Sequence, residues 1–186
     1  MDEANKMNKM VRQLLTLTAL EFGNDTPSIA AFDVTELVHD LINSSGILIQ
    51  QNAAKVSVDM PETLVVMGDE FKIEEVVTNY LTNAMNHLGG DHNIRIWSET
   101  LDGVAKIHVY NNGTPIPEED LPNLWTKFYK VDKARTRAYG GSGIGLSIVK
   151  AIMEAHHQQY GVANHEDGVE FWFTLALAPE KPKEEE

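Results

Sequence analysis

Residues 140–150 read GGSGIGLSIVK, a glycine-rich turn that leads into a helix expected over about residues 143–157. Glycines allow the backbone to approach a bound anion closely, and a helix N-terminus supplies free N–H groups and the positive end of the helix dipole. The stretch lacks the Gly-Lys-Ser/Thr ending of a P-loop, and it follows a charged loop where a Rossmann fingerprint would follow a strand. It therefore predicts a phosphate-binding turn that belongs to neither of those classes.

The segment before that helix, residues 112–142, is rich in Gly, Pro and charged residues and shows little hydrophobic periodicity. A structureless stretch of that length inside a compact domain is more often a functional lid than a connector. Five of the chain's 15 Lys and Arg residues fall within it, namely Lys127, Lys130, Lys133, Arg135 and Arg137. One basic loop in an otherwise acidic chain predicts the binding of a small anion.

The composition limits the classes of protein to which the chain can belong. Its 186 residues suffice for one domain of ordinary size, and 42% hydrophobic with 23% charged residues is a globular balance that excludes intrinsic disorder. A formal net charge of −13 argues against nucleic acid or an anionic membrane surface as a partner. The absence of Cys excludes disulfides and thiolate metal sites, and no apolar run approaches the roughly 18 residues of a membrane span.

A further helix is expected from Asp69, a capping residue, to about Leu88, where Gly89-Gly90 ends it. Beside its apolar stripe runs a second stripe within about 80° of one face, formed by Glu75, Asn79, Asn83 and Asn86. Asn is a middling helix former, so three in register need a reason. One interpretation is a solvated face, and the other is a row of oxygens that reaches a hydrated Mg²⁺ and the phosphates of a ligand. The spacing alone leaves both open.

Hydrophobic periodicity predicts the remaining elements. Helices are expected over residues 2–22 and from Asp33 toward residue 53, short strands over 55–60 and 63–67, and hairpins that pair 93–99 with 104–111 and 160–164 with 169–176. This order predicts an α/β (α+β) two-layer sandwich, in which helices cover one face of a mixed, mostly antiparallel sheet.

The long loop opens with YNNGTPIP, residues 110–117, at the end of a predicted strand. On the plain interpretation a strand simply leaves into a Gly/Pro turn. On the functional interpretation Asn111 hydrogen-bonds the edge of a base, and Gly113 allows the close approach.

Taken in order, these segments resemble the nucleotide-binding catalytic domain of bacterial sensor histidine kinases, within the GHKL ATPase superfamily. The resemblance covers residues 31–178. Within the family, the chain is similar to the branch of membrane-bound kinases that includes vancomycin-resistance sensors. TNYLTNAMNH resembles the N box, NNGTPIP the first glycine box, LWTKFYKVDKAR the phenylalanine box and GGSGIGLSIVK the second glycine box. The resemblance implies the Bergerat (GHKL) fold, with ATP and Mg²⁺ as cofactors and residues 112–142 as the ATP lid.

The resemblance also implies roles for single residues. Asn83 would hold Mg²⁺, with Asn79 beside it near the phosphates, and Asn111 would face the adenine amino group. Phe128 would anchor the lid while Lys130 and Arg135 reach toward the phosphates, which makes Asn79, Lys130 and Arg135 the candidate catalytic residues. The other nucleotide contacts that it implies are Asn86, His87, Gly113, Ile116, Tyr129, Lys133, Gly141, Ser142, Gly143, Ile144, Gly145 and Leu146.

Four residues bear on how this chain differs from its relatives. Asn111 stands where the family usually has Asp, so a neutral acceptor replaces a charged one, a loss of about 1 kcal/mol or roughly fivefold in affinity. Asn86 stands where a basic residue is common, and Lys130 where Arg is usual. Asn79 stands where gyrase-like and mismatch-repair ATPases place a water-activating Glu. Because Asn is a poor general base, efficient hydrolysis of ATP by water is not expected.

The sequence holds seven His, and none has the setting of a family phosphoacceptor, a His before an acidic residue and a Pro on the first helix of a dimeric bundle. His39 and His165 have acidic followers, but they fall in a helix of the nucleotide domain and at a hairpin tip. By resemblance, residues 1–23 are the end of the second bundle helix, and the acceptor His is expected upstream of Met1. Residues 24–30 would be a linker, 31–178 the catalytic domain and 179–186 a flexible acidic tail.

The resemblance thus implies a histidine protein kinase fragment that transfers the γ-phosphate of ATP to a His of its own dimerisation domain, and from there to an Asp of a response regulator. It implies a homodimer anchored in the bacterial cell membrane for the full-length protein, and a cytoplasmic location without membrane contact for these residues. Two alternatives remain open. One is a nucleotide-sensing or scaffold module in which Asn111 and Asn86 mark lost catalysis; the other is a GHKL anti-sigma serine kinase, against which the helix over residues 2–22 counts.

Overall fold

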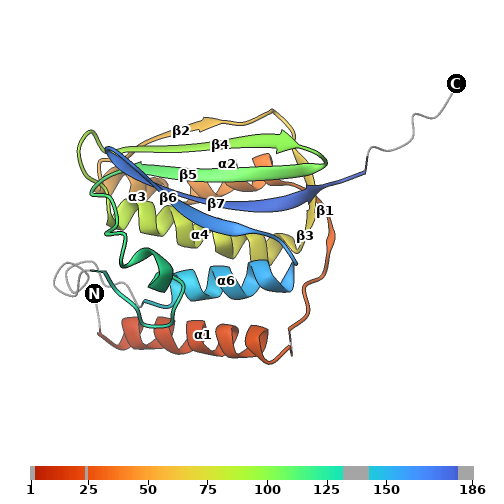
Figure 1. The fold of residues 1–186 in the computed structure, drawn as a ribbon, viewed down its shortest axis with the longest axis horizontal. Coiled ribbons are helices and arrows are strands. Elements are labelled where there is room, and N and C mark those ends of the chain that lie inside the picture. The colour runs from red at the N-terminus through yellow and green to blue at the C-terminus, as the bar shows by residue number, and fades with distance from the viewer. Residues whose placement is uncertain (1–2, 24, 132–142, 180–186) are drawn as a thin grey trace, which may run out of the picture.

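The sheet that carries the fold has seven strands in the computed structural model, which describes residues 3–23, 25–131 and 143–179 (Figure 1). The strands are β1 Ala30–Asp33, β2 Lys55–Asp59, β3 Val65–Gly68, β4 Asn93–Leu101, β5 Val104–Asn112, β6 Tyr160–His165 and β7 Gly168–Leu177. Their spatial order is β1-β3-β7-β5-β4-β2, and β6 pairs with the N-terminal part of β7. β2 runs parallel to β4, while the other described pairs are antiparallel. The mixed, mostly antiparallel sheet expected from the sequence is confirmed.

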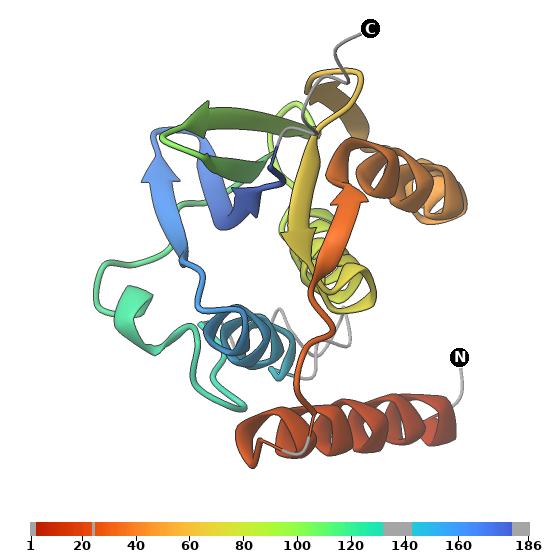
Figure 2. The same ribbon diagram turned by 90° about the vertical axis from the view of Figure 1, so that its right-hand side faces the viewer.

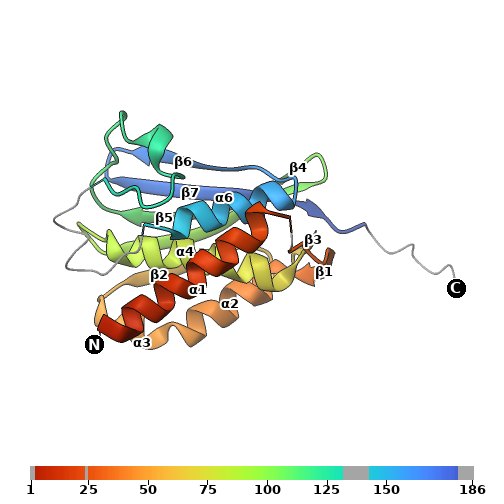
Figure 3. The same ribbon diagram turned by 90° about the horizontal axis from the view of Figure 1, so that it is seen from below.

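Helices cover one face of this sheet (Figure 1). The helices of the described residues are α1 Glu3–Glu21, α2 Val34–Ser44, α3 Gly46–Gln51, α4 Glu70–Asn86 and α6 Gly145–Ala155, with the short 3-10 helix η1 Leu121–Asn123 in the long loop. Figures 2 and 3 show α1 as a further layer outside α6, beyond the two layers of the sandwich. In the described part of the chain no helix combines the length and apolarity needed to cross a membrane.

The core lies between the sheet and α4. Alternate side chains of the central strands point toward the helices, and the buried ones include Ile94, Ile96, Ile107, Val109, Phe171 and Phe173. From α4, Tyr80 packs on Phe171 with ring centroids 5.2 Å apart and donates its hydroxyl hydrogen to the Trp172 carbonyl at 3.2 Å. Full burial of a large apolar side chain contributes about 1.5–3 kcal/mol. These contacts fix the rotation of α4, and with it the direction of its polar face.

Two elements differ from the sequence prediction. The helix expected from Asp33 toward residue 53 is broken at Ser45 into α2 and α3, because residues 44–46, Ser-Ser-Gly, are poor helix formers. Asp33 caps α2, since its carboxylate accepts from the Thr35 N–H at 2.9 Å. β1 was not predicted, because its four residues show no alternation and pair only with a strand more than 30 residues away.

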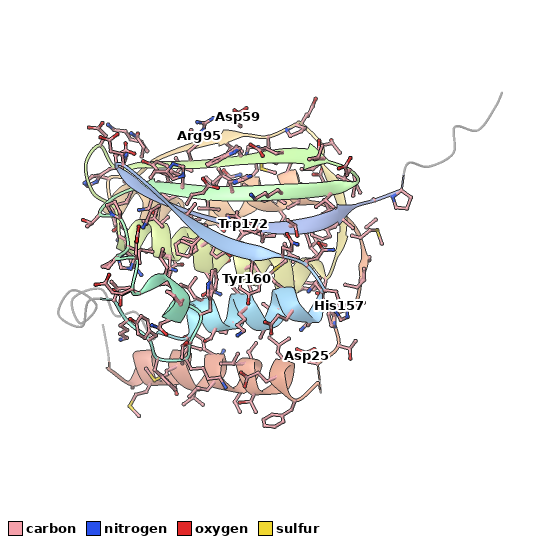
Figure 4. The ribbon with its side chains drawn as sticks, in the orientation of Figure 1. Asp25, Asp59, Arg95, His157, Tyr160 and Trp172 are labelled. Atoms are coloured by element: carbon pink, nitrogen blue, oxygen red, sulfur yellow. The ribbon has the colours of Figure 1, made fainter. Side chains whose placement is uncertain are left out.

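Polar and aromatic side chains cover the other face of the sheet (Figure 4). Asp59 and Arg95, which Figure 4 labels on β2 and β4, form an exposed ion pair of 3.5 Å. Trp172 of β7 lies over Gly161 of β6, where a Cβ would come within 2.4 Å of the indole ring, so only glycine fits there. The Asn111 side chain of β5 belongs to the opposite, helix-covered face, so the predicted site lies on the helical side of the sheet.

The contacts of α1 are both apolar and ionic. Leu17 and Leu20 are buried on the domain, and the Glu21 carboxylate accepts from the Lys127 ammonium at 2.5 Å. Just beyond the helix, the Asp25 carboxylate pairs with Lys72 of α4 at 2.5 Å (Figure 4). Another stripe of α1 is exposed and contains Met7, Val11 and Leu15. The proposed division into residues 1–23, 24–30, 31–178 and 179–186 stays a prediction.

Candidate active site

Three segments that are far apart in the sequence meet at one end of the sheet: the C-terminal half of α4, the end of β5 and the start of α6. At their closest junction a Cβ on Gly145 of α6 would lie 2.6 Å from the Asn79 Oδ1 atom of α4. Side-chain carbons do not approach oxygens that closely, so a residue with a Cβ at this position would displace the Asn79 side chain. The asparagine stripe and the glycine-rich turn are therefore parts of one site, although the sequence presents them as separate motifs.

Three asparagines of α4 are half-buried and lie along one face: Asn79, Asn83 and Asn86. The Asn79 amide nitrogen donates to the Glu75 carbonyl at 2.8 Å, so its oxygen is turned toward the glycine turn. Burial raises the pKa of the Glu75 carboxyl above its ordinary value, an effect that Lys72 opposes. Half-burial indicates a face bordered by another segment, which favours the functional interpretation of the stripe over a freely solvated one.

Asn111 is the last residue but one of β5, the strand that faces this helix, and it is only 3% exposed. Its amide nitrogen donates to the His87 carbonyl at 3.4 Å and to the Asn112 carbonyl at 3.0 Å. Because carbonyl oxygens only accept, these two bonds fix which end of the amide is nitrogen. The Asn111 oxygen then points the other way, and it accepts no hydrogen bond from the described residues. This arrangement offers a free, directed acceptor to an incoming donor.

The turn after β5 is pressed against the end of α4. A Cβ on Gly113 would lie 2.4 Å from the His87 carbonyl oxygen, so glycine is required at this position. His87 caps the C-terminus of α4, because its backbone N–H donates to the Asn83 carbonyl. His87 is exposed. Ile116 is held by the Asn164 side chain, which accepts from its N–H at 2.9 Å and donates to its carbonyl at 2.7 Å. Asn164 was missed in the sequence, because it lies 48 residues away on β6.

The described part of the lid packs on the domain through Leu124, which is buried, and through the partly buried Trp125, neither of which the sequence prediction weighed. The Trp125 ring packs edge-on against Tyr160, with centroids 4.7 Å apart, and against Phe171 at 6.0 Å. Phe128, the expected anchor, has a side chain that is 55% exposed and a left-handed φ of 62°. Its contribution comes from the backbone, since its N–H donates to the Gly143 carbonyl at 2.8 Å. That bond joins the described part of the lid to Gly143, the residue that follows the lid.

Several other predicted residues lie around the Gly143 turn. Gly143 has a φ of +71°, and a Cβ there would meet the Lys130 side chain at 3.3 Å, so Lys130 lies beside the turn. The Tyr129 hydroxyl donates to the Asp120 carboxylate, which together with burial raises the pKa of the phenol. Ile144 is buried before the first turn of α6, and Leu146 is half-buried within it. Lys133, Arg135, Gly141 and Ser142 lie outside the described residues.

The site's donor set bears on the metal that it could hold. Among residues 3–23, 25–131 and 143–179 there is no group of three or more His, Asp or Glu that could bind a metal ion. Amide oxygens such as that of Asn83 are hard ligands, and Mg²⁺ is commonly bound through one or two protein oxygens with waters and substrate phosphates completing the shell. The residues present therefore fit Mg²⁺ that arrives with a nucleotide, and they do not fit a resident metal held by the protein alone.

His156 is a further residue that the sequence prediction missed. It ends α6, and its Nε2 accepts from the Asp69 N–H at 3.0 Å while its Nδ1 lies 2.8 Å from the Ile152 carbonyl. An N–H can only donate and a carbonyl can only accept, so this ring is neutral with its proton on Nδ1. Burial accordingly lowers the pKa of His156 below 6.5. Since Asp69 caps α4, this ring ties together the two helices that form the site.

Comparison with known proteins agrees with this fold and site. Residues 68–179 match the family of histidine kinase-, DNA gyrase B- and HSP90-like ATPases. The chain is 31% identical over 171 residues to the sensor protein VanSB of Enterococcus faecalis. The alignment covers 92% of this chain and 38% of VanSB. The resemblance to sensor histidine kinases seen in the motifs is confirmed.

Solved structures give the same result. The catalytic domain of the histidine kinase ThkA aligns with a TM-score of 0.72 at 28% identity, over 82% of this chain and 98% of that one. ThkA in complex with the response regulator protein TrrA aligns with a TM-score of 0.76 at 26% identity, over 96% of this chain and 49% of that one. The chain spans between about a third and a half of the length of the curated relatives that it matches.

Proposed function

We propose that this chain, which belongs to the family of histidine kinase-, DNA gyrase B- and HSP90-like ATPases, binds ATP between α4, the end of β5 and the lid and donates the γ-phosphate to a histidine side chain. The observation that carries the proposal is the junction of Asn79 with Gly145, which brings a row of amide oxygens to the N-terminus of a helix. A helix N-terminus binds phosphate, and hard oxygens bind the magnesium ion that accompanies it.

Each part of the site has a task in this proposal. The Gly143–Gly145 turn and the first N–H groups of α6 bind the phosphates, with Gly141 and Ser142 extending the same turn. Asn83 holds Mg²⁺, which neutralises phosphate charge, and Asn79 lies beside it. Lys130, with Lys133 and Arg135 of the lid, brings positive charge to the γ-phosphate. At the other end the Asn111 oxygen accepts from the adenine amino group, while Gly113 lets the base approach.

Phosphoryl transfer needs chiefly position and neutralised charge, and these are what the site supplies. An imidazole nitrogen forms a bond to the γ-phosphorus while the bond from that phosphorus to the bridging oxygen breaks, so that ADP leaves and the imidazole loses its N–H proton. Asn79 stands where hydrolytic relatives have a Glu. Its amide has no basic lone pair to take a proton from water, so transfer to an acceptor is favoured over hydrolysis.

The acceptor in this proposal is a histidine outside the 186 residues. Of the chain's own histidines, His108 and His156 are buried, and His165 is bonded to Glu170. The exposed stripe of α1 suits a partner helix in a dimeric bundle, which is where the family carries its acceptor. ThkA was solved in complex with the response regulator TrrA. We therefore extend the proposal to a response regulator Asp as the next acceptor, to a homodimer of the longer protein, and to a cytoplasmic location of this domain beside a membrane anchor.

Titration calorimetry of ATP, with and without Mg²⁺, tests the proposal. We expect Mg²⁺-dependent binding on the order of −5 to −8 kcal/mol, which corresponds to micromolar to submillimolar affinity. Asn83→Ala should lose the Mg²⁺-dependent part, whereas Asn43→Ala, an exposed Asn on α2, should bind like the wild type. If the wild-type chain binds no ATP, the proposal is wrong and the scaffold alternative replaces it. If transferred phosphate proves stable to acid on a protein Ser, the serine-kinase alternative replaces it.

A further inference from the structure

The residue that organises the end of β5 is Asn112, and each of its polar groups has a partner. Its carbonyl accepts from the Gly89 N–H at 3.0 Å and from the Asn111 amide, also at 3.0 Å. Its side-chain oxygen accepts from the Asn93 N–H at 3.2 Å. Its side-chain nitrogen donates to the Asp167 carboxylate at 3.1 Å. Asn112 thus joins three loops, although it has no direct route to a nucleotide on the helical side of the sheet.

Asp167 is the charged end of this network. It lies in the turn between β6 and β7, where its second carboxylate oxygen accepts from the Tyr110 hydroxyl at 2.7 Å and its carbonyl accepts from the Gly113 N–H at 2.9 Å. Burial and the bond to Asp167 raise the pKa of Tyr110 to about 12. The adjoining Gly168 has no room for a side chain, since a Cβ would lie 2.2 Å from the Asn111 carbonyl oxygen. The turn is therefore locked against the end of β5 on both sides.

We propose that Asp167 is a positioning residue for base recognition: through Asn112 it holds the Asn111 amide so that the oxygen, and not the nitrogen, faces the base. Two hydrogen bonds link Asp167 to Asn111: the Asn112 side-chain nitrogen donates to the Asp167 carboxylate, and the Asn111 amide nitrogen donates to the Asn112 carbonyl. This rests on the proposed function, in which the base binds at Asn111. A directed oxygen accepts from the amino group of adenine, whereas a reversed amide would donate to the ring carbonyl of guanine.

The prediction that separates positioning from mere support concerns the preference for ATP over GTP. If the network only supports the fold, damage to it lowers both affinities together and leaves their ratio unchanged. If it sets the direction of the Asn111 amide, damage lowers the affinity for ATP and raises or spares that for GTP. The ratio is therefore the informative quantity, and thermal unfolding of each variant reports the structural part separately.

An exchange of side chains provides the sharpest experiment. The Asn112 amide nitrogen lies 3.1 Å from the Asp167 carboxylate, and Asn112→Asp replaces that nitrogen with a carboxylate oxygen. Repulsion between the two carboxylates should move residue 112 and free the Asn111 amide. Asn112→Asp combined with Asp167→Asn restores one carboxylate and one amide in reversed places, so the bond forms again. Asp167→Ala removes the carboxylate and serves if Asn112→Asp does not fold. Asp102→Asn, which makes the same charge change in the exposed turn at the other end of β5, is the matched control.

Calorimetric titration of MgATP and of MgGTP into each folded variant gives the ratio. We expect it to fall about tenfold, equivalent to 1.4 kcal/mol, in Asn112→Asp and in Asp167→Ala. It should return to within about threefold of wild type in the exchanged pair and remain unchanged in Asp102→Asn. An unchanged ratio in Asp167→Ala, or a ratio not restored by the exchange, overturns the inference while the proposed function stands. A wild-type chain that binds neither nucleotide overturns both.

Discussion

The family's usual residue should not improve this chain's site. Asn111→Asp introduces the carboxylate expected at this position from the family resemblance, and on sequence grounds alone it should strengthen the binding of ATP by about 1 kcal/mol, since charge-assisted hydrogen bonds are the stronger ones. The structure leads to the opposite expectation. The Asn111 amide nitrogen donates to two carbonyl oxygens, and a carboxylate has no hydrogen with which to do so.

The magnitude follows from those two bonds and from burial. Each donated bond contributes about 1 kcal/mol to stability, so their loss costs about 2 kcal/mol. A carboxylate oxygen in the same place would lie 3.0 Å and 3.4 Å from carbonyl oxygens, in a residue that is 3% exposed, which adds a further penalty of about 1 kcal/mol. The predicted loss of about 3 kcal/mol in the free energy of unfolding corresponds to roughly 6–12 °C in a domain of this size. Turning the carboxylate away from the carbonyls also turns it away from the base, so the affinity for ATP should not rise.

Chemical and thermal unfolding at pH 8, together with ATP titration, provide the test. The order of stability should be wild type, then Asn111→Ala, then Asn111→Asp, because Ala loses the bonds without adding repulsion. The Asp variant should recover part of its deficit toward pH 5, where a protonated carboxyl can donate to a carbonyl. An Asp variant as stable as wild type at pH 8, with several-fold tighter ATP binding, would refute the reasoning.

Three more results are expected. Burial holds the pKa of His156 below 6.5, so the unfolded chain binds more protons than the folded one as the pH falls below that value. The free energy of unfolding should therefore decrease on acidification. His156→Gln keeps an acceptor and a donor, and in urea titrations it should remove that part of the pH dependence. Gly145→Ala should lower the affinity for ATP at least about tenfold, because its Cβ would displace Asn79, and an unchanged Kd in calorimetry would contradict this. Leu17→Ala should cost about 2–4 kcal/mol of unfolding free energy, whereas Glu21→Gln, which breaks a partly exposed ion pair, should cost less than about 1 kcal/mol. Equal costs in denaturant unfolding would contradict this, because they would show that the ion pair contributes as much as the apolar contact.

The elements that the sequence predicts well are those whose signals are local. The α4 helix begins at the expected cap, since the Asp69 carboxylate accepts from the Lys72 N–H, and its asparagines fall on one face by helical spacing alone. The β4–β5 hairpin and the β6–β7 hairpin follow from alternation around a Gly-containing turn. Those cues decide the layers of the fold, because each one specifies which face of an element is apolar.

What the sequence does not contain is long-range pairing. Nothing local indicates that β2 runs parallel to β4 at the edge of the sheet, or that β1 forms at all. Long-range contacts are also missing from the sequence signal in the site. The sequence alone presents Asp167 as an ordinary turn residue and Trp125 as an aromatic residue in a charged loop. Their roles depend on partners 55 and 35 residues away, which only the register of β5, β6 and β7 brings close.

The two site amides share one structural feature, and it bears on what a carboxylate at either position would change. Asn79 and Asn111 each tie the amide nitrogen to a main-chain carbonyl, of Glu75 in one case and of His87 and Asn112 in the other, and each thereby turns its oxygen toward the site. A carboxylate cannot be anchored in this way, because it has no donor. At Asn79 it would also place a negative charge beside the phosphates and a base beside any water there. An anchored amide keeps the acceptor and its direction while it omits both the charge and the basicity. A site built on such amides should hold ATP without the repulsion that a carboxylate at Asn79 would add, and it should preserve the γ-phosphate for an acceptor that docks.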